Sequence, residues 1–210
     1  MTRIRLREPR LAEEESQYYG RVYPDGYRHD RWPDHVERVA ASVDMIRKYT
    51  GLIATAADLS CGDAAILRQL SPELETAYLG DLNGITVDSA EWGSRIVHTL
   101  PPGLLPDSLD YLPECVDLFV LSETLEHIPD PDMLLQSLKL FSRYLFLSTP
   151  EQEREDSGNL EHYWSWASAD IQEMLTAAGW TPLERQLLVP QSTRTLDGAY
   201  HYQMWMAVAR

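Results

Sequence analysis

The sequence has few cysteines and no long hydrophobic run. Only two of its 210 residues are cysteines, Cys61 and Cys115, which are too few for a disulfide framework and lack the spacing of a zinc ribbon. No stretch approaches the roughly 18 consecutive apolar residues of a membrane helix. The first 16 residues, MTRIRLREPRLAEEES, lack the apolar core of a signal peptide. These absences predict a cytoplasmic globular protein with no membrane partner.

Basic residues are scarce beyond the N-terminal quarter of the chain. The whole sequence holds 18 Lys and Arg against 33 Asp and Glu, a net charge of -15. Residues 1–48 hold 10 basic and 9 acidic residues, so residues 49–210 carry a net charge of -16. Because nucleic-acid binding depends on clustered Lys and Arg, this balance disfavours nucleic acid as a partner and favours a small-molecule substrate.

The composition changes near residue 50, and residues 1–48 predict an N-terminal cap segment. Residues 16–32 are rich in tyrosine and are interrupted by glycine and proline, a pattern typical of a loop or a short helix. Pro33 is suited to the first turn of a following helix. Apolar residues then recur every three or four positions and form a stripe that we expect to dock on the main core, namely Val36, Val39, Ala40, Val43 and Ile46.

Residues 49–210 predict one α/β domain with a mostly parallel sheet, because short apolar runs alternate with helical patterns. We expect strands at 53–58, 77–81, 95–98, 116–121 and 144–148. We expect helices at 63–71, 84–91, 132–142 and 168–178, the last ending at Gly179. Residues 181–189 and 199–209 are predicted to form a closing antiparallel hairpin.

Small residues follow the first predicted strand of this domain. Asp58 ends the strand, and Ser60, Cys61 and Gly62 lead directly into a helical pattern, so that backbone amides can approach a ligand closely. Asp81 ends the next predicted strand and is placed to accept hydrogen bonds from the two hydroxyls of a ribose. Together these features predict a nucleoside-containing cofactor at the carboxyl ends of the strands.

The same residues resemble the first motif of the class I S-adenosylmethionine-dependent methyltransferases, Asp-x-Gly-Cys-Gly-x-Gly. Asp58, Cys61 and Gly62 match it, whereas Ser60 and Ala64 stand where glycine is usual. Residues 116–131, VDLFVLSETLEHIPDP, are similar to the fourth-strand motif of the ubiquinone-biosynthesis O-methyltransferases. The resemblance covers nearly all of residues 50–210. It implies a Rossmann-like sheet of seven strands with an antiparallel last strand, helices on both faces, and cofactor bound over the ends of the first two strands.

The resemblance also implies further cofactor contacts. Leu109 and Asp110 lie in a segment similar to the one that brackets the adenine in the family, with Asp107 as an alternative to Asp110. Leu82 follows the second strand and Ser122 ends the fourth, so both are expected beside the cofactor. From the N-terminal segment, Tyr19 or Tyr23 is expected near the cationic sulfonium, because positive charge favours aromatic faces.

The array Glu123, Glu126 and His127 directly follows the central strand and is the predicted catalytic centre. If the segment is helical, the three side chains share one face. One interpretation is that His127 is a general base for an acceptor hydroxyl. The other is a divalent metal such as Mg²⁺, for which His162 would be a further ligand. That second interpretation draws on a similarity between the region around His162 and the small-RNA 2′-O-methyltransferases.

These observations predict an S-adenosylmethionine-dependent methyltransferase that acts on a hydroxyl of a small molecule. Three alternatives remain open: an N-methyltransferase acting on a small amine or amino sugar, a metal-dependent RNA 2′-O-methyltransferase, and a noncatalytic protein that binds the cofactor. The charge distribution disfavours the RNA substrate. The oligomeric state, monomer or homodimer, is not indicated by the sequence.

Overall fold

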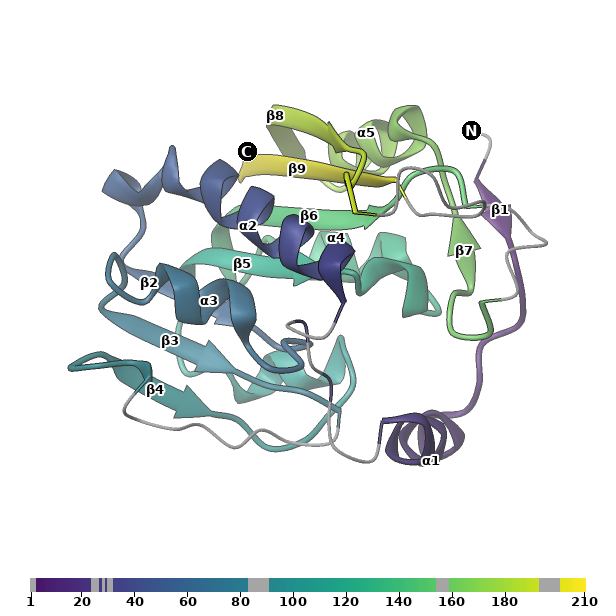
Figure 1. The fold of residues 1–210 in the computed structure, drawn as a ribbon, viewed down its shortest axis with the longest axis horizontal. Helices are drawn as coiled ribbons and strands as arrows, with labels where there is room; N and C mark the ends of the chain where they lie inside the picture. Colours follow the sequence, from purple (N-terminus) through teal and green to yellow (C-terminus); the bar gives the residue numbers. More distant parts are fainter. Residues whose placement is uncertain are drawn as a thin grey trace.

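The computed structural model describes residues 3–23, 27, 29, 32–82, 91–153, 159–192 and 201–210. A large central sheet runs through this part of the chain, and a small two-stranded sheet lies at one end of the molecule (Figure 1). The strands are β1 (Ile4–Arg5), β2 (Thr55–Asp58), β3 (Thr76–Leu79), β4 (Ile96–Thr99), β5 (Val116–Ser122), β6 (Ser142–Pro150), β7 (Trp164–Ser165), β8 (Trp180–Leu188) and β9 (Tyr202–Ala209).

The central sheet has seven strands in the order β4-β3-β2-β5-β6-β9-β8. The neighbouring strands from β4 to β6 are parallel, whereas β9 is antiparallel to both β6 and β8. This topology confirms the predicted Rossmann-like fold class. The antiparallel last strand of the sequence, β9, lies between β6 and β8. The predicted closing hairpin is formed by β8 and β9, which pair from Trp180 with Ala209 to Leu188 with Tyr202.

Helices cover both faces of this sheet (Figure 1). The α-helices are α1 (Ala12–Val22), α2 (Pro33–Arg47), α3 (Ala65–Leu70), α4 (Pro131–Leu138) and α5 (Ser168–Ala177). The short 3-10 helices are η2 (Thr50–Leu52), η4 (Asp107–Tyr111) and η5 (Leu125–His127). No helix in the described residues is both long enough and apolar enough to cross a membrane.

The side chains of β5 show how the two faces are built. Leu118 and Val120 belong to a buried cluster that includes α2 and α3. Phe119 and Leu121 belong to a second buried cluster, which includes α4 and α5. Because successive residues of a strand point to opposite faces, a strand buried on both sides must be apolar throughout. The continuous apolar run therefore fits a central strand, as predicted.

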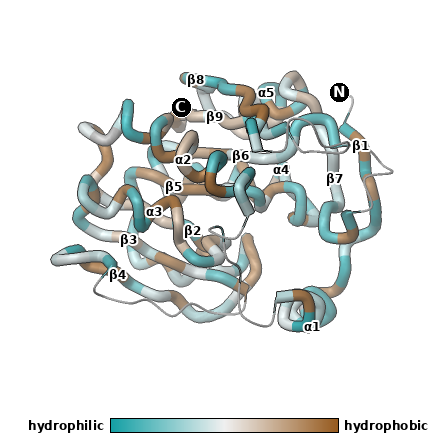
Figure 2. Tube along the Cα trace, viewed as in Figure 1, coloured by the Kyte–Doolittle hydropathy of each residue, from teal (hydrophilic) through white to brown (hydrophobic). Residues whose placement is uncertain are grey.

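Helix α2 packs against the sheet as expected from its apolar stripe. Proline occupies its first turn, where a missing backbone N–H costs nothing. Val39, Val43 and Ile46 are buried in the same cluster as β2 and α3, whereas Val36 is exposed at the start of the helix. Hydrophilic and hydrophobic residues alternate along α2 in Figure 2.

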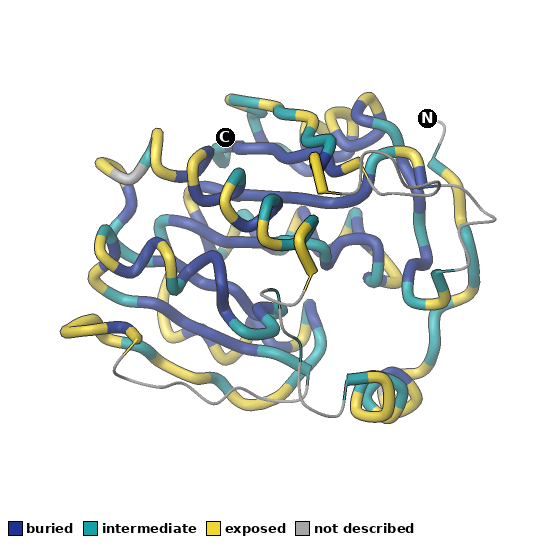
Figure 3. The backbone as a smooth tube through the Cα atoms, viewed as in Figure 1, coloured by how far each residue is buried: buried dark blue, intermediate teal, exposed yellow. Residues whose placement is uncertain are grey.

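The N-terminal segment lies at the end of the molecule where β7 is found (Figure 1). β1 pairs with β7 in the antiparallel sense, so Ile4 and Arg5 are neighbours of Ser165 and Trp164, far along the sequence. The tyrosine-rich segment is helical up to Val22, and this helix, α1, already begins at Ala12. The helix is longer than the sequence indicated because Glu13, Glu14 and Glu15 supply favourable negative charge to its first turn. Figure 3 shows α1 largely exposed, in contrast to the buried strands β5, β6 and β9.

Most predicted elements occur at the expected places, with shorter helices. The helix expected at 63–71 is α3, six residues long, and the one expected at 132–142 ends at Leu138. Gly179 has a φ of 86° just beyond α5, which is the left-handed conformation typical of a glycine after a helix. For the helix predicted at 84–91, residues 84–90 lie outside the described residues.

Candidate functional site

A cavity of about 470 Å³ opens where the strands β2, β3 and β5 end. Its volume is in the range of sites that hold small molecules. The carboxyl ends of parallel strands are the usual ligand site of this topology. The described lining residues are Glu15, Tyr19, Tyr23, Tyr27, His29, Trp32, Asp34, His35, Leu59, Ser60, Gly62, Asp81, Leu82, Gly103, Leu104, Leu105, Ser122, Glu123, Thr124, His127, Ile128, Pro150, Asn159, Glu161, His162 and Tyr202.

The loop after β2 forms one wall of the cavity. The backbone N–H of Ser60 donates to Oδ1 of Asp58 at 3.1 Å, and the N–H of Gly62 donates to Oδ2 of Asp81 at 2.9 Å. Ser60 also contacts the loop after β5, because its hydroxyl lies 2.7 Å from the hydroxyl of Thr124. These contacts join the ends of β2, β3 and β5 into one rigid rim.

Two residues of this loop explain why glycine is frequent in the corresponding motif. Gly62 has a φ of 55°, and a Cβ placed on it would lie 3.3 Å from the side chains of His29 and Tyr27. Ala64 also has a φ of 55°, a conformation in which a side chain is disfavoured. Ala64 is small enough to adopt this conformation, so the turn forms without glycine at that position.

Six of the predicted cofactor-binding residues line the cavity: Tyr19, Ser60, Gly62, Asp81, Leu82 and Ser122. Two others, Asp58 and Cys61, are buried in the loop and are not among the lining residues. Leu109 is buried in the apolar cluster on the α4 and α5 face, and Asp110 is exposed. Neither lines the cavity, so in the structure the nearby wall is formed instead by Gly103, Leu104 and Leu105.

Asp58 is a buried carboxyl at the base of the cofactor loop. Burial raises its pKa to about 7, and the neighbouring charge of Asp81 acts in the same direction. Hydrogen bonds from Ser60 act in the opposite direction by favouring the ionised form. The folded protein therefore holds a proton at Asp58 up to near neutral pH.

Arg38 of α2 supplies a buried positive charge below the cavity. Its side chain is fully buried, and one terminal nitrogen donates to the hydroxyl of Ser122. The Ser122 hydroxyl lies 2.9 Å from that of Ser148, which donates to Oε1 of Glu123 at 2.8 Å. The Nε and Nη2 atoms of Arg38 have no hydrogen-bond partner among the described residues. A buried guanidinium with unpaired donors is suited to an anionic group of a ligand.

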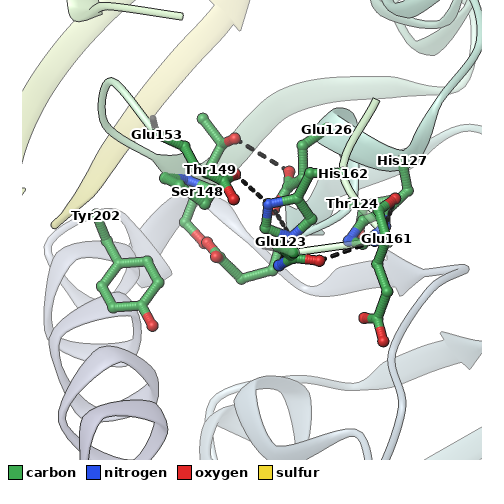
Figure 4. Close-up of polar contacts among 12 residues, drawn as sticks. Glu123, Thr124, Glu126, His127, Ser148, Thr149, Glu153, Glu161, His162 and Tyr202 are labelled. Atoms are coloured by element: carbon green, nitrogen blue, oxygen red, sulfur yellow. Dashed lines mark hydrogen bonds and ion pairs between the residues drawn. The ribbon is translucent and has the colours of Figure 1, made fainter. Parts of the chain in front are cut away.

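The three residues of the predicted catalytic array do not share a helical face. Glu123 has a φ of 51° and precedes the short helix η5, which contains Glu126 and His127. The structure instead brings Glu126 and His127 together with His162, whose potential ligand atoms all lie within 4.8 Å of one another (Figure 4). Nε2 of His162 lies 4.0 Å from Oε1 of Glu126. The candidate centre therefore combines η5 with the segment before β7.

Hydrogen bonds hold each member of this group, and Nε2 of His162 lies 3.1 Å from Nδ2 of Asn159. Thr149 donates to Oε2 of Glu126 at 3.0 Å, and Oε1 is buried with no partner among the described residues. Nδ1 of His162 is hydrogen-bonded to Glu153. Nδ1 of His127 lies 3.0 Å from the carbonyl oxygen of Glu161 and 2.9 Å from the hydroxyl of Tyr19. An imidazole that donates from Nδ1 to a carbonyl presents a lone pair at Nε2.

Burial controls the protonation of this centre. Burial, together with the charge of Glu123, raises the pKa of Glu126 to about 8. Burial lowers the pKa of His127 well below its usual value, so this imidazole is neutral at pH 7. For His162, burial would lower the pKa, but the carboxylates of Glu153 and Glu126 outweigh it and raise the pKa. Neutral His127, which is half-buried and lines the cavity, is thus a proton acceptor or a metal ligand.

Several lining residues were not predicted from the sequence. Glu15 and Glu161 come from segments 146 positions apart, which the pairing of β1 with β7 and hydrogen bonds such as that from Tyr163 to Glu15 bring together. His29 lines the cavity while bound to Asp63, and burial lowers the pKa of the nearby His35 to about 4. The only sequence signal for this wall was the density of aromatic residues in the segment 16–32.

Neither a protein-family model nor a curated protein sequence matches this chain. Solved methyltransferase structures do match it over most of their lengths. The 1,6-didemethyltoxoflavin-N1-methyltransferase of Burkholderia thailandensis has a TM-score of 0.65 at 17% identity, covering 99% of this chain and 94% of that one. Magnesium protoporphyrin IX methyltransferase of Synechocystis PCC 6803 has a TM-score of 0.64 at 16% identity, covering 92% and 94%.

A third structure, the N-methyltransferase NodS of Bradyrhizobium japonicum, has a TM-score of 0.63 at 16% identity, covering 87% of this chain and 91% of that one. All three were solved with S-adenosylhomocysteine bound. The chain has the fold of these methyltransferases. At such low identities the likeness establishes the fold alone.

Proposed function

We propose that this protein is an S-adenosylmethionine-dependent methyltransferase that methylates a hydroxyl group of a small molecule. The observation that carries the proposal is one cavity whose wall combines the loop of Ser60, Gly62 and Asp81 with the neutral imidazole of His127. The similar structures support it, because proteins of this fold are described with S-adenosylmethionine or its demethylated product.

The residues at the β2 and β3 end fit such a cofactor. Asp81 lines the cavity at the end of β3, where a carboxylate can accept hydrogen bonds from ribose hydroxyls. Arg38, with two unpaired buried nitrogens, would provide a counter-charge for the cofactor's carboxylate. The faces of Tyr19 and Tyr23 suit its sulfonium. When bound, the cofactor would supply an electrophilic methyl group.

His127 is the proposed proton acceptor for the hydroxyl. Its Nδ1 is engaged by the Glu161 carbonyl, so the free lone pair at Nε2 is the basic site. Tyr19 packs edge-on to the His127 ring, with ring centroids 6.2 Å apart, and restrains its orientation. The chain thereby positions the acceptor and removes its proton, which are the contributions that an enzyme makes to a displacement of this kind.

The same residues also fit a divalent cation, which we propose as the second role of this centre. The unpaired Oε1 of Glu126 is the observation that favours it, because a buried carboxyl oxygen without a partner is costly and an ion would displace the proton that burial holds on this group. Glu126, His127 and His162 would hold the ion, and Glu153 would orient His162 from behind. Such an ion would lower the pKa of a bound hydroxyl.

N-methylation is a second candidate function. Two of the similar structures are N-methyltransferases, and amines need little help from a base. An RNA acceptor is disfavoured by the net charge of -16 on residues 49–210. The remaining alternative is a protein that binds the cofactor without transferring its methyl group. Such a protein would give no methylated product, unlike the three methyltransferases.

Calorimetric titration with S-adenosylmethionine tests the proposal directly. We expect saturable binding to the purified protein, and no binding at millimolar cofactor would refute the function. Comparison of variants tests the assigned roles. Substituting His127 by alanine is expected to lower the rate of methyl transfer while preserving cofactor binding, whereas Asp81→Ala is expected to weaken binding. Insensitivity of the rate to His127→Ala would instead favour an amine acceptor.

A further inference from the structure

Two carboxylates line the end of the cavity that α1 covers. Glu15 lies in α1, and its side chain is only 7% exposed. Its Oε2 accepts from the hydroxyl of Tyr163 at 2.6 Å and from Arg10 at 3.2 Å. Its Oε1 is buried and has no hydrogen-bond partner among the described residues. A buried carboxylate oxygen in this state gains free energy from any ligand that brings a donor.

Glu161, from the segment before β7, faces the same space. Both of its carboxylate oxygens accept from the one hydroxyl of Tyr23, at 3.0 Å and 3.2 Å. The ion pairs of the described residues include none for Glu161, whereas Glu15 is paired with Arg10. The two carboxyl groups, Glu15 and Glu161, thus share one guanidinium, that of Arg10. Burial raises the pKa of Glu161, and the hydrogen bond from Tyr23 acts in the opposite direction. A cationic ligand would supply a second positive charge to this end of the cavity.

The walls around these carboxylates are aromatic. The rings of Tyr19 and Tyr23 are stacked, with centroids 5.9 Å apart and an interplanar angle of 19°. Aromatic faces and carboxylates together are the usual surroundings of a bound ammonium group. The described lining residues include no lysine or arginine, but they do include the acidic residues Glu15, Asp34, Asp81, Glu123 and Glu161. The lining of this end of the cavity therefore favours cations over anions, whereas Arg38 lies at Ser122.

The two carboxylates come from α1 and from the segment before β7, and not from the loops after β2 and β3 that are proposed to bind the cofactor. Glu161 adjoins the proposed base. The backbone of Glu161 accepts from His127, while its carboxylate points away from Glu123, Glu126 and His162 (Figure 4). Building on the proposed function, we infer that the acceptor is a cationic molecule whose ammonium group binds between Glu15 and Glu161 while its hydroxyl faces His127. The substrate class is then an amine-bearing alcohol or phenol.

Three matched probes test this inference: tyramine, which is cationic, para-ethylphenol, which is neutral, and phloretate, which is anionic. Each is titrated calorimetrically into protein saturated with S-adenosylhomocysteine. We expect tyramine to bind tighter than para-ethylphenol by about tenfold or more, because a charge-assisted hydrogen bond to a buried carboxylate is strong. Phloretate is expected to bind weakest. The variant Glu161→Gln keeps the shape of the site and should bring tyramine and para-ethylphenol to similar affinities.

The matched control is Glu13→Gln, which makes the same charge change at an exposed position of α1 and should preserve the preference for tyramine. Equal affinities of the three probes, a failure of tyramine to bind, or a preference that survives in Glu161→Gln would overturn the inference. The titrations are repeated without S-adenosylhomocysteine. Tyramine selectivity in a protein that does not bind S-adenosylhomocysteine would support the cation site and refute the methyltransferase, so the two failures are distinguishable.

Discussion

The imidazole of His127 is fixed by the main chain of Glu161. The two meet at 3.0 Å, between Nδ1 of the ring and the carbonyl oxygen. A carbonyl oxygen accepts only, so the proton of the neutral ring lies on Nδ1 and the lone pair on Nε2. Because burial lowers the pKa of this histidine, the same tautomer persists below the usual titration range of histidine.

The protonation of His127 is directly observable. We expect two-dimensional nitrogen NMR of the imidazole groups to show His127 neutral, with its proton on Nδ1, from neutral pH down through the usual histidine pKa of about 6.5. The spectrum of His127→Gln identifies the resonance. A midpoint at or above that value would contradict the assignment of His127 as a buried neutral base.

Asp81 and Asp110 were both predicted to bind the cofactor, but they differ in position. Asp81 lines the cavity, whereas Asp110 is exposed and does not. Asp81→Asn is expected to raise the dissociation constant of S-adenosylmethionine by about tenfold, the loss typical of a hydrogen bond to a charged group. Asp110→Asn should leave it unchanged. Equal losses in both variants, measured by calorimetry, would show that the cofactor is not bound in the cavity that Asp81 lines.

A divalent cation held by Glu126, His127 and His162 is expected to raise the melting temperature, because it binds only the folded protein. Burial holds a proton on Glu126 up to a pKa of about 8, so binding releases protons and strengthens as the pH rises toward that value. Thermal unfolding with Mg²⁺, Mn²⁺ and Zn²⁺ measures the effect. Glu126→Gln should abolish it, whereas Glu173→Gln, at an exposed position of α5, should not. An unchanged melting temperature with all three ions would leave His127 as a free base.

Asp58 predicts how stability depends on pH. Its pKa is about 7 in the folded protein and 3.8 in its ordinary state, so the folded state binds the proton more tightly. The contribution of Asp58 to the free energy of unfolding therefore falls as the pH rises from about 4 to about 7, and it levels off above that window. Asp58→Asn keeps an oxygen for the Ser60 N–H and removes this loss.

Urea unfolding of both proteins across that window gives the comparison, and Asp110→Asn serves as the exposed control. The free energy of unfolding should decline less in Asp58→Asn than in the unsubstituted protein. Parallel declines would show that Asp58 is ionised throughout.

Arg7 is expected to order the segment that carries His162. Its guanidinium donates to the carbonyl oxygens of His162, at 3.0 Å, and of Asn159. Arg7→Ala should speed amide hydrogen exchange in residues 159–165, because each lost hydrogen bond is worth about 1 kcal/mol. Exchange in β5 should not change, and Arg21→Ala is the control at an exposed position. Protection that is retained in Arg7→Ala would show that other contacts, such as that of Arg10 with the Leu160 carbonyl, order this segment without Arg7.

The order of strands and helices could be predicted because each signal is local. Residues 118–121 are apolar on both faces of β5, and Pro33 marks the start of a helix, so pattern and structure coincide. The loop of Ser60 and Gly62 was likewise predictable, since its chemistry follows from residues adjacent in the sequence.

The rest of the site depends on long-range pairing, which leaves no periodic signal. Glu15 and Glu161 line one cavity because the segments around them are joined by the β1–β7 pairing and by contacts such as Tyr163 with Glu15, and nothing in either segment indicates the partner. The helical face expected for Glu123, Glu126 and His127 was wrong because Glu123 adopts a positive φ before a single 3-10 turn. Leu109 and Asp110 stay predictions as cofactor contacts, although the structure places both away from the cavity.

The contacts of Arg7 with residues 152 and 155 positions later have a consequence for how the protein is made. During synthesis the first residues leave the ribosome long before the segment that they must bind. The strands β2 to β5 have all been synthesised before the segment that carries His162. Ligand binding by this cavity should therefore begin only when most of the chain has emerged, and a nascent chain stalled before residue 159 should bind no acceptor.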